Sequence, residues 1–294
     1  MRFKSTIDHI SLLTALLQSA EKMGRRAILK LTNETMFLIC AKGEGDVQMW
    51  SNVPVDNIFS EYRIESNSNN NTIALEFTIT PLVQALRSAS SKNGDRDAAE
   101  VVLKLIKKGT EAALCLDVKT ETKDGKKLNV VHEVHVLVRK PAEIDEMSQP
   151  KCPPLETHIE LPSADQCRPV VDHLRQISDI IWLGATRDGR FRLSVANDST
   201  DIETMWTGLR NTTIVREKTE VADEEEDEGD DAEWHNVPLD AKILQKWLSS
   251  QVLQNNVIAG IAPRYCVVAY IYVGDRQHGG IITYYIPSRN VEFD

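Results

Sequence analysis

The hydrophobic pattern of the first half of the chain predicts single helices alternating with groups of strands. Residues 2–7 (RFKSTI) predict a strand. Apolar residues then recur every three or four positions from about Asp8 to Met23, and this spacing predicts an amphipathic helix. A shorter helix begins at TPLVQ, where Thr80 fits the N-cap and Pro81 the first helical position. The other runs that predict strands here are AILKLT, MFLICA, VQMWSNV, TIALEFTI, AAEVVLKLI, EAALCLDVKT and KLNVVHEVHVLVR.

This pattern stops at residues 140–156. The segment KPAEIDEMSQPKCPPLE contains four prolines and no hydrophobic period, which is typical of an extended linker. A chain of 294 residues is also longer than one hydrophobic core usually needs. We therefore expect a first domain over 1–139, a linker over 140–156 and a second domain over 157–294.

The second half repeats the same order of elements. Its first helix is predicted in SADQCRPVVDHLRQIS, where Ser163 and Gln166 fit a capping box. Pro169 would interrupt the hydrogen bonds of this helix, so the helix either begins late or is kinked there. A short second helix is predicted in DAKILQKWLSSQ. The runs that predict strands in this half are HIELP, IIWLGAT, RFRLSVA, DIETMWTGLR, WHNVPL, NVIAGIA, YCVVAYIYV and GIITYYIP.

Two short matches support an internal repeat. FLICA at 37–41 corresponds to RLSVA at 192–196, and Met49-Trp50 corresponds to Met205-Trp206 at nearly the same offset. Because the order of elements matches as well, we predict two tandem copies of one α+β fold.

The charge of the chain is concentrated in one segment. Residues 217–233 carry eleven acidic side chains and one basic one, Lys218, which equals the net charge of −10 of the whole chain. The rest of the chain is therefore charge-balanced. The insert, at about 216–233, is poor in apolar residues, so we expect a solvated, mobile loop whose role the sequence does not assign.

Several functional classes are disfavoured. The apolar runs are strand-sized and the N-terminus shows no signal-peptide pattern, which disfavours membrane insertion and secretion. The five cysteines are odd in number and form no CxxC pair, so we expect reduced thiols in the cytosol or nucleus, three of them in apolar strands.

The sequence contains no motif that convincingly predicts catalysis. HEVH at 132–135 is not HExxH, and His132 and His135 would point to opposite faces of a strand, so they cannot share a metal ion. The glycines of KGEGD and GDRQHGG lie between strands and predict hairpin turns, not phosphate-binding loops. We therefore expect no catalytic residues, no cofactor and no metal site.

Basic residues lie opposite the apolar stripe of each predicted helix. Ordinary surface charge would explain them equally well, unless the four helices share one surface, which would then attract phosphates without reading bases. The residues for which we predict electrostatic contact with phosphates, such as those of DNA, are Lys22, Arg25, Arg26, Arg87, Arg168, Arg175, Lys242 and Lys246.

The order of elements and the proline-rich connector resemble sliding clamps of the PCNA superfamily. The segments RFK, FLICAKGEGDVQMW, HIELPSADQCRPVVDHLRQIS, LGATRDGRFRLSVA and YYIPS are similar to Hus-one-type subunits of the nine-one-one DNA damage checkpoint clamp. The resemblance covers nearly the whole chain, apart from the details of the linker and the acidic insert. It implies helices on the inner face of antiparallel sheets.

The resemblance also implies a function and partners. The expected role is a non-catalytic, nuclear subunit of a ring that includes two other subunits, of Rad-nine and Rad-one type. Such a ring is loaded around double-stranded DNA at damage sites by an ATP-driven clamp loader. It then serves checkpoint signalling and repair enzymes, which dock beside the linker.

The same family geometry implies that the subunit interfaces use strands at 111–119 and 201–209. The interface residues predicted on this basis are Leu114, Leu116, Val118, Ile202, Thr204 and Trp206. Alternative functions are a homotrimeric PCNA-like replication processivity clamp, a protein-binding or chaperone-like module that uses the acidic segment, and an unidentified enzyme.

Overall fold

The computed structural model consists of two compact units. It describes residues 1–41, 45–89, 100–121, 127–140, 142–143, 147–197, 199–211, 232–253, 255–274 and 279–289. Unit 1 comprises Met1–Lys42, Gln48–Gln149 and Tyr272–Ile282, and unit 2 comprises Gly43–Val47, Pro150–Ile271 and Thr283–Asp294. The predicted linker is thus divided between the two units, and the predicted domain bounds remain a prediction. Of the predicted acidic insert at about 216–233, residues up to 231 lie outside the described residues.

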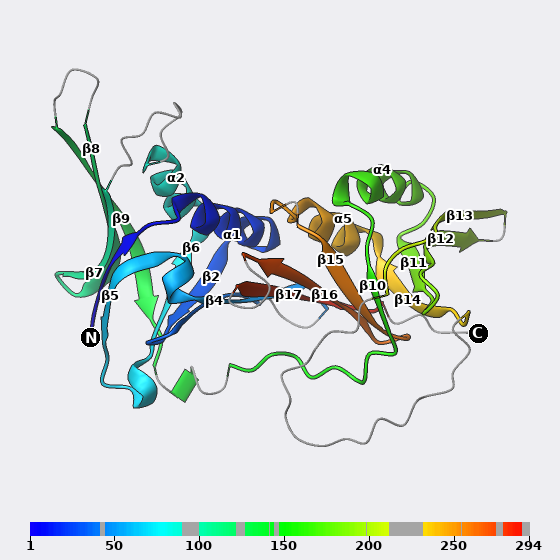
Figure 1. Ribbon diagram of the computed structural model, residues 1–294, viewed down its shortest axis with the longest axis horizontal. Helices are drawn as coiled ribbons and strands as arrows, with labels where there is room; N and C mark the ends of the chain where they lie inside the picture. Colours follow the sequence, from blue (N-terminus) through cyan, green and yellow to red (C-terminus); the bar gives the residue numbers. More distant parts are fainter. Residues whose placement is uncertain are drawn as a thin grey trace. The chain divides into compact units, whose positions relative to one another are not determined.

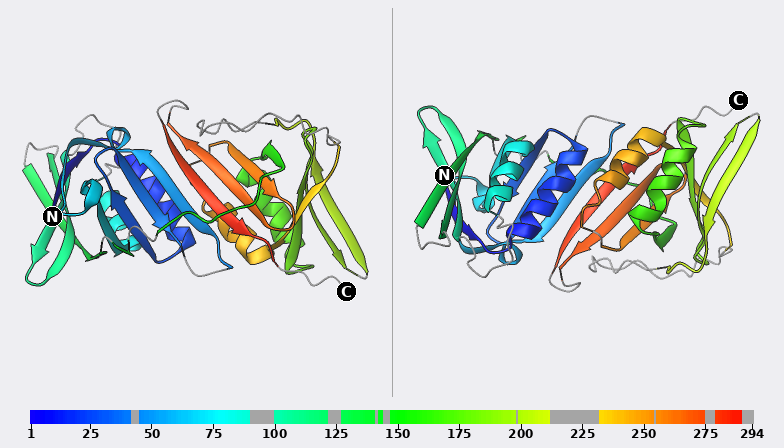
Figure 2. Two further views of the ribbon diagram at one scale, coloured as in Figure 1. Left: turned by 90° about the horizontal axis from the view of Figure 1, so that it is seen from below. Right: turned by 90° about the horizontal axis from the view of Figure 1, so that it is seen from above.

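Unit 1 is an antiparallel sheet with two helices on one face (Figures 1 and 2). Its strands lie in the order β4-β3-β2-β6-β9-β8-β7-β1-β5. The elements are β1 (Arg2–Ile7), α1 (Ile10–Met23), β2 (Arg26–Leu31), β3 (Thr35–Cys40), β4 (Gln48–Pro54), β5 (Phe59–Glu65), β6 (Ile73–Thr78), α2 (Ile79–Ala89), β7 (Glu100–Lys108), β8 (Glu111–Glu121) and β9 (Lys127–Val138), with short 3-10 turns at Val55–Asn57 and Asn69–Asn71.

The apolar periodicity of unit 1 explains this layering. In α1, Leu16, Leu17 and Ala20 recur at helical spacing and are at most 1% exposed. In β2, burial alternates, so that Leu29 and Leu31 are buried while their neighbours are more exposed. The buried leucines of α1 and β2 belong to the layer between the helices and the sheet, which is the core of unit 1. Burying each of these leucines contributes about 1.5–3 kcal/mol to the stability of the fold.

Strand β5 was not predicted from the sequence. Its side chains Ser60, Tyr62 and Ile64 are only half-buried, and Glu61 and Arg63 are exposed, so no apolar period marks it. It pairs with β1 at the end of the sheet, and the register shifts between Lys4 and Thr6. Its position is set by this pairing and by ring contacts of Phe59, which is 3% exposed, and of Tyr62 with Phe3 of β1.

Unit 2 repeats the design with two sheets and two helices (Figures 1 and 2). One sheet has the order β10-β15-β16-β17, and the other has the order β13-β12-β11-β14. The elements are β10 (Thr157–Glu160), α4 (Ala164–Leu174), β11 (Ile180–Ala185), β12 (Phe191–Asn197), β13 (Thr200–Trp206), β14 (His235–Asp240), α5 (Ala241–Ser249), β15 (Val257–Ala262), β16 (Cys266–Val273) and β17 (Gly280–Pro287).

The predicted tandem repeat is confirmed. FLICA falls on β3 and RLSVA on β12, which are the second strands after the first helix of each unit. Met49-Trp50 and Met205-Trp206 fall on the next strands, β4 and β13. The α+β prediction is therefore correct.

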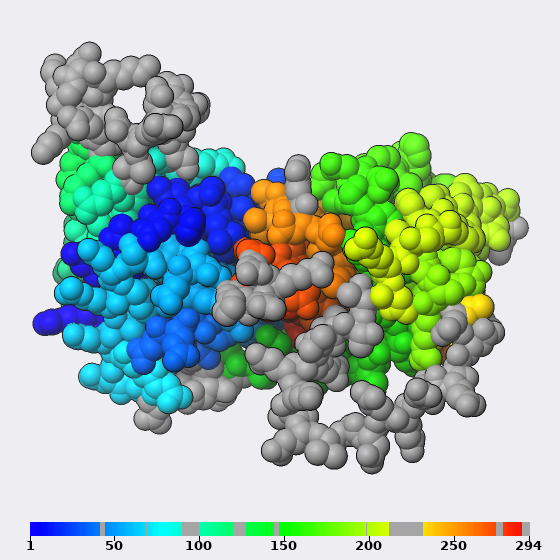
Figure 3. Space-filling model, viewed as in Figure 1, coloured from blue at the N-terminus to red at the C-terminus, as the bar shows by residue number. Residues whose placement is uncertain are grey.

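Helix α4 excludes one of the two alternatives raised by Pro169. The helix has Ser163 as its N-cap, and the Ser163 N–H donates to Oε1 of Gln166 at 3.2 Å. A late start is therefore wrong, and the helix continues through Pro169 to Leu174. The proline lacks an N–H but lies on the exposed side of α4. In the space-filling view α4 forms a ridge at the surface of unit 2 (Figure 3).

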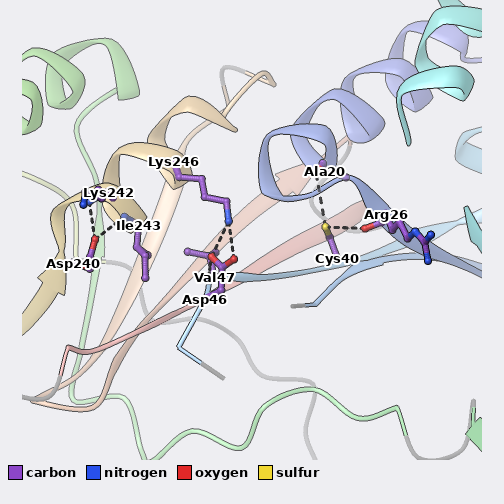
Figure 4. Close-up of polar contacts among 9 residues, drawn as sticks. All are labelled: Ala20, Arg26, Cys40, Asp46, Val47, Asp240, Lys242, Ile243 and Lys246. Atoms are coloured by element: carbon purple, nitrogen blue, oxygen red, sulfur yellow. Dashed lines mark hydrogen bonds and ion pairs between the residues drawn. The ribbon is translucent and has the colours of Figure 1, made fainter. Parts of the chain in front are cut away.

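The three cysteines predicted in strands are buried there. Cys40 is 2%, Cys115 3% and Cys266 4% exposed. The Cys40 thiol lies 3.7 Å from the carbonyl oxygen of Ala20 and 3.4 Å from that of Arg26, and donates toward both (Figure 4). Among the described residues, no helix is long and apolar enough to cross a membrane.

Candidate nucleic-acid interface

In unit 1 the predicted helix cations lie on the exposed side of α1 and α2. Lys22 is in the last turn of α1, where a cation is favoured by the helix dipole, and Arg25 follows the end of the helix at Gly24. Arg87 is exposed on α2, and with the Gln18 amide turned toward it, the amide oxygen accepts from Nε at 3.2 Å and Nη2 at 3.1 Å. Within the described part of the chain, Lys22 and Arg25 have no ion-pair partner.

Arg26 lies elsewhere. It is the first residue of β2 and not part of the helix end. Its side chain lies on the face of the sheet opposite the one on which Ala27 is buried. Its guanidinium pairs with Glu76 at 3.3 Å, and Glu76 also pairs with Arg139. Arg26 therefore lies on a strand and not on a helix, and its predicted contact with DNA remains a prediction.

Arg168 of α4 is held within unit 2. Its Nε and Nη2 donate to the carbonyl oxygen of Leu248 at 3.3 and 3.0 Å, and its Nη1 pairs with Asp165 at 3.0 Å. The Leu248 carbonyl is one of the groups at the end of α5 that have no partner within the helix. The guanidinium therefore joins α4 to the C-terminus of α5.

The other predicted cations of unit 2 are also largely compensated. Lys246 Nζ pairs with both carboxylate oxygens of Asp46, at 2.7 and 2.9 Å, and the two side chains are 26% and 27% exposed (Figure 4). Arg175 donates to Gln245, whose amide donates to Asp172 at 2.6 Å. Lys242 is exposed beside Asp240, which caps α5 by accepting from the backbone N–H groups of residues 242 and 243 (Figure 4).

The two helix layers therefore differ in electrostatics. Unit 1 presents exposed cations that are available to an external anion, whereas most of those in unit 2 already contact a carboxylate, an amide or a carbonyl. Such a layer can attract the phosphate backbone of DNA without reading its sequence. DNA contact at these residues remains a prediction.

The predicted interface strand at 111–119 was assigned to the wrong position in the sheet. β8 pairs with β7 on one side and with β9 on the other, and Leu114, Leu116 and Val118 are at most 2% exposed. These residues belong to the core of unit 1. An interior strand has no free backbone groups for a neighbouring subunit, so β8 cannot extend a sheet across an interface.

Strand β9 provides the exposed edge instead. It pairs with β8 along its whole length, but with β6 only at Val136, Leu137 and Val138. Residues 127–135 therefore have one strand neighbour within the described residues. Leu128 and Val131 on this edge are 48% and 51% exposed. Because β8 and β9 are both apolar in sequence, no local signal distinguished the edge strand from the interior one.

In unit 2 the predicted strand does lie at an edge. β13 pairs with β12, and it ends the four-stranded sheet of the described residues. Ile202 is 38% exposed, Thr204 and Trp206 are half-buried, and the Trp206 ring packs against Phe191 with centroids 5.4 Å apart. Each unit thus presents a partly apolar strand edge, at β9 and at β13. Contact with a neighbouring subunit at β13 remains a prediction.

The histidines of HEVH lie on opposite faces of β9, as predicted. His132 Nε2 lies 2.8 Å from the Ser88 hydroxyl on the helix side, and His135 Nδ1 lies 3.2 Å from Glu111. In the part of the chain that the structure describes, no cluster of three or more His, Cys, Asp and Glu side chains could hold a metal ion.

Comparison with known proteins identifies the family. Residues 1–290 match the family model described as Hus1-like protein. The chain belongs to the Hus1-like family. Relatives in this family include "Checkpoint protein hus1" of Schizosaccharomyces pombe, which is 30% identical over 98% of this chain and 99% of its own length. Human "Checkpoint protein HUS1" is 26% identical over 67% of this chain and 69% of its own length.

Solved structures show the clamp fold. PCNA from Thermococcus kodakaraensis aligns over 98% of this chain and 100% of its own, with a TM-score of 0.66 and 16% identity. Proliferating Cellular Nuclear Antigen from Entamoeba histolytica aligns over 98% and 99%, with a TM-score of 0.66 and 12% identity. The predicted PCNA-like fold and the resemblance to Hus-one-type subunits are both confirmed.

Proposed function

We propose that this Hus1-like chain is a non-catalytic subunit of a checkpoint sliding clamp that encircles double-stranded DNA in the nucleus. The observation that carries the proposal is a partly apolar strand edge in each clamp unit, at residues 127–135 of β9 and at β13. Two edges allow one chain to bind two neighbours by continuing a sheet, which is how a ring of such units closes. The names of the relatives supply the checkpoint role.

The neighbours are proposed to be different proteins, of Rad-nine and Rad-one type. The helix layer of unit 2 is largely charge-compensated, so this chain supplies few free cations, and the partners would supply the rest. An ATP-driven loader would open the ring, and repair enzymes would dock beside the linker.

The proposed path of DNA is tested by replacing Lys22 and Arg25 with alanine in the clamp assembled with its two partners. Each lost phosphate contact should reduce the salt dependence of DNA binding by about 0.9 in log K against log salt, so the slope should fall by roughly 2. Affinity at low salt should fall about tenfold, while the ring remains assembled.

A matched control removes the same charge from another face of unit 1. Lys4 and Arg63 lie directly opposite each other on β1 and β5, and both are exposed. Replacing both with alanine should leave the salt slope unchanged, as measured by fluorescence anisotropy on a DNA duplex. Equal slopes for the two double variants would contradict contact at α1.

A further inference from the structure

The end of the linker lies against the outer face of a unit 2 sheet. Residues 150–156 run along the side of β15 and β16 opposite α4 and α5 (Figure 1). The Glu156 N–H donates to the Ile261 carbonyl at 2.9 Å, and the Glu156 carboxylate contacts His235 at 2.8 Å. Leu155 lies so close to Gly260 that a Cβ there would be 2.5 Å from its methyl carbon. The C-terminal end of the segment is therefore bound to the sheet.

A second contact holds the segment at Cys152. Its sulfur lies 3.4 Å from the sulfur of Cys266 on β16, and 114 positions separate the two residues in the sequence. Cys266 belongs to a small apolar cluster with Ala262 and Val268, against which Cys152 and Leu155 pack. All five cysteines are in the described part of the chain and all are reduced.

The two thiols are close enough to be joined with little movement. A disulfide requires about 2.05 Å between the sulfurs, so they must approach by roughly 1.4 Å. Cys152 lies in a segment without helix or strand, whereas Cys266 is fixed in β16. Rotation of the Cys152 side chain and a small shift of the linker can supply this movement.

The two cysteines also differ in exposure. Cys152 is half-buried, and Cys266 is 4% exposed. Burial and the adjacent thiol raise the pKa of Cys266, so it remains protonated at neutral pH. Oxidants react with accessible thiolates, which makes Cys152 the first site of attack and Cys266 the resolving thiol.

We propose that Cys152 and Cys266 form a peroxide-oxidisable dithiol whose disulfide fixes the linker to the outer face of unit 2. Hydrogen peroxide oxidises the Cys152 thiolate: its O–O bond breaks, a sulfenic acid forms and hydroxide leaves. The Cys266 sulfur then attacks the Cys152 sulfur, the S–O bond breaks, and the departing hydroxide takes the Cys266 proton as water. In total, two thiols lose two protons and two electrons, and one peroxide becomes two waters.

The disulfide would change what can bind at this face. In the reduced chain, residues 150–154 can lift from β15 and β16 while Leu155 and Glu156 stay seated. In the oxidised chain the segment is fixed at both ends, so a ligand that inserts between linker and sheet is excluded. This proposal is independent of the proposed clamp function because it rests on contacts within unit 2 alone.

The test uses the full chain treated with a small excess of hydrogen peroxide, then alkylated, digested without reduction and analysed by mass spectrometry. We expect a cross-linked Cys152–Cys266 peptide two hydrogens lighter than its two halves, with Cys40, Cys115 and Cys167 still thiols. Trypsin cleavage of the folded chain after Lys151 should slow about tenfold and recover with dithiothreitol, because cleavage follows the population of the lifted linker.

Two variants make the result specific. Cys152→Ser, at a half-buried linker position, should abolish both the cross-link and the effect of peroxide on cleavage. Cys167→Ser is the matched control, since Cys167 is a buried thiol in α4 whose pKa burial raises to about 12, and it should retain both effects. The proposal is overturned if Cys152 is oxidised to a sulfinic acid while Cys266 remains a thiol, or if both resist peroxide.

Discussion

Replacing Ile202 of β13 with aspartate is expected to release the chain from one neighbour in the clamp and to leave its contact with the other intact. Ile202 is 38% exposed on the β13 edge, so the free chain tolerates the change. In a closed interface the new carboxylate would be buried without a partner, which is strongly unfavourable. Binding to that neighbour should weaken about a hundredfold, the scale of an interface hot spot.

The companion substitution is Leu128→Asp on the β9 edge, where Leu128 is 48% exposed. It should release the opposite neighbour. Binary complexes of each variant with each partner subunit can be measured by size-exclusion chromatography with light scattering. Val252→Asp, at an apolar residue 36% exposed after α5, serves as the control and should bind both partners. If either edge variant binds both partners normally, or loses both, the assignment of edges to neighbours is wrong.

Truncating Trp247 to alanine is expected to destabilise the protein by about 3–5 kcal/mol. Trp247 lies in α5 and is 1% exposed, and it lines a small interior cavity with residues of α4 and β12, among them Cys167, Phe191 and Leu193. Its removal would leave a large void beneath the two helices of unit 2. Urea unfolding should show a lower midpoint.

The Trp247→Phe variant separates packing from hydrogen bonding. The buried indole N–H has no hydrogen-bond partner among the described residues, so its removal relieves the cost of an unsatisfied donor. We expect a loss below about 1.5 kcal/mol, because the apolar ring is largely retained. A loss of stability as large as that of the alanine variant would contradict this, and would show that the indole N–H donates a stabilising hydrogen bond.

The features that the sequence predicted well are those with a local period or a local partner. Helix α1 follows from apolar residues at helical spacing, and the start of α4 follows from Ser163 and Gln166. The tandem repeat follows because both units need the same order of elements around a core. Each of these depends on residues that are near in sequence, or on a pattern that occurs twice.

The features that the sequence missed depend on long-range pairing. β8 and β9 are both apolar strands, and only the hydrogen-bond partners show that β9 is the edge. Arg168 and Lys246 are basic residues of the kind that contact DNA. In the structure, however, Arg168 donates to the Leu248 carbonyl and Lys246 pairs with the Asp46 carboxylate. Helical periodicity locates the exposed face of a helix, but it cannot show which distant group that face meets.

The linker cysteine is another long-range case. The sequence pattern indicated no partner for Cys152 because Cys266 is 114 positions away, on β16, the second-to-last strand of the described chain. The close packing of Leu155 against Gly260 places the nearby Cys152 against the same sheet. A glycine within an apolar strand was the one local signal of a close approach.

The central claim is that this chain works as one of three different subunits of a ring. It is tested most directly by sedimentation equilibrium of the purified chain, alone and with two further clamp subunits. The account predicts a monomer that joins a one-to-one-to-one complex with both partners. A stable homotrimer of the chain alone would contradict it and would favour a homotrimeric processivity clamp.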